Sequence, residues 1–109
     1  MEFDKETQQK IQELQNFEQT LQGMLMQKQA FQMELSETEN ALDELEKTTD
    51  EVFKIVGNIM IKTSKTKTQA ELKRKKELVT LRLSSIEKQE NDLTKKAQDL
   101  KEEVMKKLK

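Results

Sequence analysis

Apolar side chains recur at alternating steps of three and four residues along the first half of the chain. The positions of this seam are Leu14, Phe17, Leu21, Met24, Lys28, Phe31, Leu35, Thr38, Leu42 and Leu45, and eight of the ten are apolar. A seam that repeats every 3.5 residues makes two helices supercoil around each other. The pattern therefore predicts a helix over about 5–47 that forms half of a coiled coil.

The second half of the chain repeats the same pattern. Its seam runs through Leu72, Lys76, Val79, Leu83, Ile86, Glu90, Leu93, Ala97, Leu100 and Val104, again with eight apolar positions in ten. The sequence from Thr68 to Glu71 has the T-x-x-E spacing of a capping box, in which the threonine accepts a backbone hydrogen bond at a helix start. A second helix is therefore predicted over about 68–109.

Two arms of nearly equal length on either side of a short connector predict an antiparallel helical hairpin. The fold class is mainly α, with residues 1–109 forming a single domain. In this register Leu14 faces Val104, and the polar seam positions Lys28 and Glu90 meet. Our hypothesis is that Lys28 and Glu90 pair across the seam and fix its register, since buried polar pairs often contribute specificity rather than net stability. A chance meeting of two polar heptad positions is the alternative.

The connector has the composition of a β-hairpin over about 52–63. Two runs rich in β-branched residues, 52–56 and 59–63, are separated by Gly57 and Asn58. Glycine at the first central position of a two-residue turn supplies the positive φ of a type II′ turn. In such a hairpin Val56 opposes Ile59, and Ile55 opposes Met60 on the other face.

This hairpin carries apolar side chains on both faces and has two unpaired edges, so it is marginal in water by itself. We expect hairpins from several subunits to pair edge to edge and close a β-barrel body from which the coiled coils project. The residues expected to form this assembly surface are Val52, Phe53, Ile55, Val56, Gly57, Asn58, Ile59, Met60 and Ile61. A solvent-exposed loop that caps a simple coiled coil is the alternative.

Composition narrows the function classes. Charged residues make up 38% of the chain and hydrophobic residues 33%, a balance that also suits disordered proteins, but the sustained seams argue against disorder in the arms. The chain has no Cys and no His, which excludes zinc sites, thiol nucleophiles and Ser-His arrangements, and it has no Gly-rich phosphate loop. We therefore expect no enzyme and no cofactor. No run is long enough to span a membrane, the residues Met1 to Asp4 do not resemble a signal peptide, and the absence of Cys is compatible with the cytoplasm.

Charge is distributed unevenly along the chain. Residues 1–61 hold five Lys and Arg against thirteen Asp and Glu, whereas residues 62–109 hold fifteen against eight. The cluster Lys73 to Lys76 raises the alternative of a nucleic-acid-binding arm. An acidic half accompanies it and no aromatic residues interleave, so solvated helix faces are the preferred interpretation, and no nucleic-acid or membrane partner is expected.

The order helix, single β-hairpin, helix, with the sequence Phe53 to Lys62 at the bend, resembles the β-class subunit of prefoldin, whose α-class counterpart has two hairpins. The Lys- and Glu-rich composition resembles archaeal members, with the eukaryotic subunit of similar design as the alternative. The resemblance implies a cytoplasmic hexamer of two α-class and four β-class subunits with a barrel body. It also implies an ATP-independent chaperone that binds unfolded proteins and passes them to a group II chaperonin. A structural coiled-coil tether or adaptor without client binding is the alternative function.

If the resemblance holds, clients are expected at the free ends of the arms, because the last turns of a coiled coil lack neighbours on one side. The candidate contact residues are Met1, Phe3, Ile11, Val104, Met105 and Leu108. Ordinary seam packing is the alternative for Ile11 and Val104. Away from the ends, Leu25 and Met26 are interpreted as helix-flank packing, with a second client-binding surface along the arm as the alternative. Leu78 and Leu81 are expected to contact the barrel or a neighbouring subunit.

Overall fold

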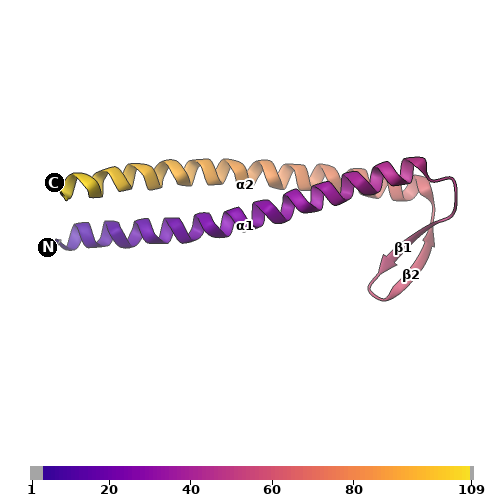
Figure 1. Ribbon diagram of the computed structural model, residues 1–109, viewed down its shortest axis with the longest axis horizontal. Coiled ribbons are helices and arrows are strands. Elements are labelled where there is room, and N and C mark those ends of the chain that lie inside the picture. The colour runs from indigo at the N-terminus through magenta and orange to yellow at the C-terminus, as the bar shows by residue number, and fades with distance from the viewer. Residues whose placement is uncertain (1–3, 109) are drawn as a thin grey trace. The chain divides into compact units, whose positions relative to one another are not determined.

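The computed structural model describes residues 4–108 and contains two long helices with one β-hairpin between them in the chain. The elements are α1 (Lys5–Lys47), β1 (Val52–Val56), β2 (Ile59–Thr63) and α2 (Lys65–Lys107) (Figure 1). The fold is mainly α, as the heptad pattern predicts. The described residues form two compact units: a terminal unit, made of residues 4–29 and 84–108, and a hairpin unit, residues 30–83.

In the terminal unit, α1 and α2 run antiparallel. Lys10 pairs with Glu103 at 3.3 Å and Lys28 pairs with Glu90 at 3.0 Å, so α2 numbers fall as α1 numbers rise. The predicted seam positions of this unit are all buried or half-buried, and those that are fully buried are Ile86, Ala97 and Val104. The seam continues one heptad before Leu14, since Thr7 is also buried. The 3.5-residue repeat therefore identifies the core of this unit.

The helices are also antiparallel in the hairpin unit, where Glu34 pairs with Lys75 and the Lys65 ammonium donates to the Thr48 carbonyl at 3.1 Å. Val79, with 1% of its surface exposed, is the most buried core side chain, and burying such a side chain contributes about 1.5–3 kcal/mol. One seam position departs from the pattern: Lys76 is exposed. A lysine at the margin of a seam keeps its ammonium group in water, and this position contributes no core.

Each helix begins at a capping residue. Asp4 precedes α1 and its carboxylate accepts a hydrogen bond from the Thr7 amide at 2.7 Å. The predicted start of the second helix at Thr68 is wrong, because α2 begins at Lys65 and Ser64 caps it through a bond from the Lys67 amide to Oγ. The Thr68 amide instead donates to the Ser64 carbonyl at 3.0 Å as an ordinary helical bond. The T-x-x-E spacing at Thr68 is therefore a helix-interior coincidence.

The β-hairpin has the predicted register. Val56 pairs with Ile59 and Ile55 pairs with Met60, so the two strands are joined by a two-residue turn. Gly57 has a φ of 61° and no other described residue has a positive φ, which excludes a type I′ turn and agrees with type II′. The turn chemistry thus fixes which side chains share a face.

Candidate functional site

Both faces of the hairpin expose apolar side chains. One face presents Val52, Lys54, Val56, Ile59, Ile61 and Thr63, and the other presents Phe53, Ile55, Met60 and Lys62. Ile55 is 71% exposed and its cross-strand partner Met60 is 64% exposed. The hairpin therefore has the exposed apolar surface that the assembly hypothesis requires.

The hairpin edges carry unpaired backbone groups. In a hairpin with a two-residue turn the flanking residues Val56 and Ile59 exchange both hydrogen bonds, and the next pair, Ile55 and Met60, directs its N–H and C=O groups outward. In the described part of the chain the sheet has two strands, so no third strand meets these groups. Each edge is consequently a template on which another strand can pair.

Charges on the hairpin lie near its base. Lys54 pairs with Glu71 of α2 at 3.5 Å, and Lys62 pairs with Glu51 at 2.9 Å. All four side chains are more than a third exposed, so each pair contributes about 0–1 kcal/mol. The residues nearer the turn, 55–61, carry no charge. Charge repulsion therefore does little to oppose the pairing of this end of the hairpin with a second hairpin.

The candidate client-binding residues of the terminal unit differ in exposure. Met105 is 50% exposed, Ile11 and Leu108 are half-buried, and Val104 is buried in the seam. An open groove of about 300 Å³ adjoins Met105 and is otherwise lined by Gln98, Lys101, Glu102 and Lys106. Met1 and Phe3 lie outside the described residues. Among the candidates that the structure describes, Met105 is the side chain most available to a partner.

An ion cluster that the sequence analysis missed lies beside these residues. The Lys10 ammonium is 3.4 Å from Glu6 and 3.3 Å from Glu103, and the hydrogen bond to Glu103 is the main cause that raises the pKa of Lys10. Hydrogen bonds from the Thr7 hydroxyl and amide lower the pKa of Asp4. The i,i+4 spacing of Glu6 and Lys10 could have identified their ion pair from the sequence. The contact with Glu103 could be identified only from the register in which the two helices pack.

Lys28 and Glu90 are in contact. The Lys28 ammonium donates to Glu90 Oε1 at 3.0 Å, and both side chains are about three-quarters buried or more. Each is one of only two polar positions in its seam, so a shift of one helix by a heptad would separate them. The contact that the register hypothesis requires is present, and its effect on register stays a prediction.

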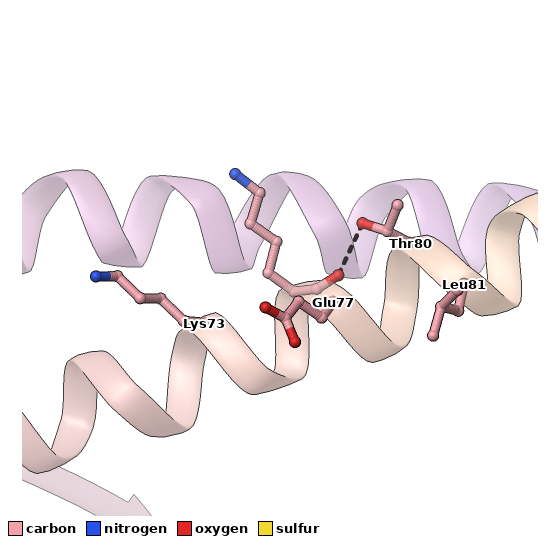
Figure 2. Close-up of a pocket in the computed structure, with 5 residues that line it drawn as sticks. Lys73, Glu77, Thr80 and Leu81 are labelled. Carbon is pink, nitrogen blue, oxygen red and sulfur yellow. Dashed lines mark hydrogen bonds between the residues drawn. The ribbon is translucent and has the colours of Figure 1, made fainter.

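Off-seam apolar residues of both helices are exposed. Leu25 and Met26 of α1 are 44% and 70% exposed, so the interpretation of helix-flank packing is wrong for them. Leu78 and Leu81 of α2 are also exposed, and Leu81 lines an open groove of about 620 Å³ (Figure 2). The helices thus carry apolar surface beyond the hairpin.

The described residues contain neither a membrane-spanning helix nor a cluster of metal-ligating side chains. No helix within residues 4–108 has the length and apolarity needed to cross a bilayer. Over the same residues, no group of three or more carboxylates is gathered as metal ligands would be. Neither observation identifies what the exposed apolar surfaces bind.

Comparison with known proteins identifies the family. The family model described as "Prefoldin subunit" matches residues 8–109. "Prefoldin subunit beta" of Saccharolobus islandicus (strain L.S.2.15 / Lassen #1) is 42% identical over 53 residues, which are 49% of this chain and 42% of that protein. The corresponding protein of Sulfurisphaera tokodaii is 45% identical over 53 residues, with the same coverage of both chains. The match thus spans less than half of the length of these curated relatives.

A solved structure extends the similarity to nearly the whole chain. The crystal structure of the prefoldin beta subunit from Thermococcus strain KS-1 matches with a TM-score of 0.87 and 36% identity. The match covers 96% of this chain and 94% of the other. Because the family model spans almost the whole sequence, and the single hairpin between two helices matches a β-class structure, the chain belongs to the prefoldin subunit family and is of the β class.

Proposed function

We propose that this chain works within a cytoplasmic hexamer of two α-class and four β-class prefoldin subunits. The observation that carries the proposal is the hairpin, which exposes apolar side chains on both faces and unpaired strands at both edges. Edge-to-edge pairing with hairpins of other subunits satisfies those edges, and closing a barrel covers one of its faces. Membership of the prefoldin family supports this interpretation of the hairpin.

The proposed complex is an ATP-independent chaperone that holds unfolded proteins and delivers them to a group II chaperonin. Met105 and its groove provide apolar surface in the terminal unit, and methionine suits irregular partners because its side chain is flexible and polarizable. Several arms of one complex engage the same client, so the overall affinity exceeds that of each weak contact. Phe3 and Leu108 are proposed to act together with Met105.

Assembly is tested by mixing the chain with an α-class prefoldin subunit and measuring the complex by native mass spectrometry. The unaltered chain is expected to enter a complex of six subunits. The Ile55→Lys and Met60→Lys double variant places two like charges opposite each other on the hairpin and is expected to abolish the complex. Met26→Lys is the control, because Met26 is an equally exposed residue outside the hairpin. A stable dimer of the unaltered chain instead would favour a structural tether.

Client binding is tested in the same mixture by the suppression of aggregation of a chemically denatured model protein. Replacing Phe3, Met105 and Leu108 with Ser is expected to weaken suppression several-fold while the mass of the complex stays the same. Met26→Ser is the matched control for the loss of an exposed methionine. Full protection by the triple variant would refute client contact at these residues.

A further inference from the structure

The groove on α2 in the hairpin unit combines an apolar floor with a rim of two ammonium groups, from Lys73 and Lys76, and one carboxylate, from Glu77. Figure 2 shows Lys73, Glu77, Thr80 and Leu81 around it, and Lys76 completes the lining. Leu81 is 68% exposed, and the Thr80 hydroxyl donates to the Lys76 carbonyl at 2.7 Å. Because that hydroxyl already has its partner, Thr80 adds no unpaired donor to the groove. Because two ammonium groups outweigh one carboxylate, the rim has a net positive charge and suits an apolar side chain that is accompanied by carboxylates.

Charge in the hairpin unit is divided between its two helical segments. The α2 segment 65–83 carries seven Lys and Arg and two Glu, whereas the α1 segment 30–47 carries six Asp and Glu and one Lys. Within the described residues only one ion pair, Lys75 with Glu34, joins these segments. Lys73 and Lys76 are exposed and belong to no ion pair there. Most of the charge complementarity is therefore not used inside one copy.

The α1 segment carries a surface that matches this groove. Met33 is 66% exposed, and Glu37 and Glu44 are exposed carboxylates that belong to no ion pair among the described residues. Spacings of four and eleven residues place all three on one face of the helix. An exposed apolar side chain thus shares its helix face with two carboxylates, which complements the apolar floor and net positive rim on α2.

We infer that the α2 groove is an interface that receives the Met33–Glu44 face of α1 from a second copy of this chain. The two surfaces differ, so the contact is head-to-tail, and each copy offers one surface of each kind to a neighbour. Like charges on each surface disfavour the pairing of α2 with α2 or of α1 with α1. The inference rests on the proposed function, in which several β-class copies share one complex, and adds the helix surfaces that bring those copies together.

Charge reversal tests the interface in the complete chain mixed with an α-class subunit. Lys73→Glu with Lys76→Glu, or Glu37→Lys with Glu44→Lys, is expected to weaken assembly at least tenfold at low salt, measured by sedimentation against concentration. All four substitutions together restore the attraction with reversed signs and are expected to recover assembly to within about threefold. Lys88→Glu with Lys95→Glu is the control, because both are exposed residues of α2 outside the groove.

Cysteine cross-linking tests the direction of the contact, since the natural chain has no Cys. A Met33→Cys chain mixed with a Leu81→Cys chain and the α-class subunit is expected to form the mixed disulfide several times faster than a Met26→Cys chain mixed with the same partner. The inference would be overturned if the mixed disulfide formed no faster than in that control, or if charge reversal left assembly unaffected. A normal hexamer of the unaltered chain would still support the proposed function in that case. Failure of the unaltered chain to assemble would overturn both. Loss of client protection or of RNA binding in the groove variants, with assembly intact, would assign the groove to a different occupant.

Discussion

Lys28 and Glu90 illustrate how one residue pair within a seam can matter more for specificity than for stability. Their contact at 3.0 Å replaces an apolar layer with two largely buried charges. Removing the charges from water has a cost that the attraction between them offsets only in part, and removing one partner leaves the other uncompensated. The pair is therefore expected to oppose a shift of register while adding little to the free energy of unfolding.

A double-mutant cycle measures this coupling. Lys28→Leu and Glu90→Leu are each expected to destabilise the chain, and the coupling free energy is expected to be about 0.5–3 kcal/mol in guanidinium unfolding followed by circular dichroism. The double variant should be as stable as the natural chain or more so, because it restores an apolar layer. Additive effects of the two substitutions would dispose of the register hypothesis.

Asp4 is expected to make the stability of the terminal unit depend on acid pH. Its pKa in the folded chain lies below the ordinary value of an aspartate, because the Thr7 hydroxyl and amide donate hydrogen bonds to its carboxylate. The stability that it contributes is present above the unfolded pKa and is lost as the pH falls through the lower, folded pKa. Asp4→Asn caps the helix without titrating. The difference in thermal midpoint between the natural chain and Asp4→Asn should therefore change below about pH 4 and be constant above pH 5; a constant difference down to pH 2 would contradict it.

At the scale of elements, the seams predict the helices and their core because burial follows the 3.5-residue repeat at nearly every position. Lys76 is the exception, since a long charged side chain at the margin of a seam remains in water. The start of α2 was predicted three residues late because the Thr68 spacing matches a capping box, whereas the actual cap, Ser64, follows directly on β2 and has Lys67 in place of the glutamate. A local motif cannot show which of two candidate caps starts the helix, because the residue at which β2 ends decides this.

The two glycines of the chain give substitutions of opposite sign. Gly57 has a φ of 61°, and a Cβ there would meet no atom within 4 Å, so Gly57→Ala is expected to destabilise the hairpin by about 1–2 kcal/mol through the backbone alone. Gly23 lies within α1 with the same open surroundings, so Gly23→Ala is expected to stabilise the chain by about 0.5–1 kcal/mol. Thermal unfolding followed by circular dichroism measures both, and shifts of the same sign would contradict the assigned turn.

At the scale of the whole molecule, the sequence predicts that the hairpin is exposed but does not predict what covers it. Ile55 and Met60 are apolar and face solvent in a single copy, which no rule of burial within one chain explains. Leu78 and Leu81 lie off the seam and are exposed in one copy as well, and their expected contact with the barrel or a neighbouring subunit stays a prediction. We expect the other subunits of the assembly to provide their environment.

Assembly should therefore appear in the thermal stability of the chain. With an α-class subunit present, the thermal midpoint is expected to rise with total protein concentration, because association stabilises the folded state by mass action. The Ile55→Lys and Met60→Lys double variant is expected to have a midpoint independent of concentration. Differential scanning calorimetry over a hundredfold range of concentration checks this, and a flat profile for the unaltered chain would count against obligatory assembly.

The hydrogen bond of the Thr38 hydroxyl bears on whether the two helices can slide past each other. It is buried in the hairpin unit, yet it donates to the Glu34 carbonyl one turn earlier at 2.7 Å and so needs nothing from α2. Displacing α2 by seven residues would leave this threonine satisfied, whereas the same displacement would strand two opposite charges at Lys28 and Glu90. We therefore expect one of these two polar layers to tolerate slippage and the other to oppose it, so a chain without the Lys28 charge is expected to keep its helices but to discriminate less between alignments.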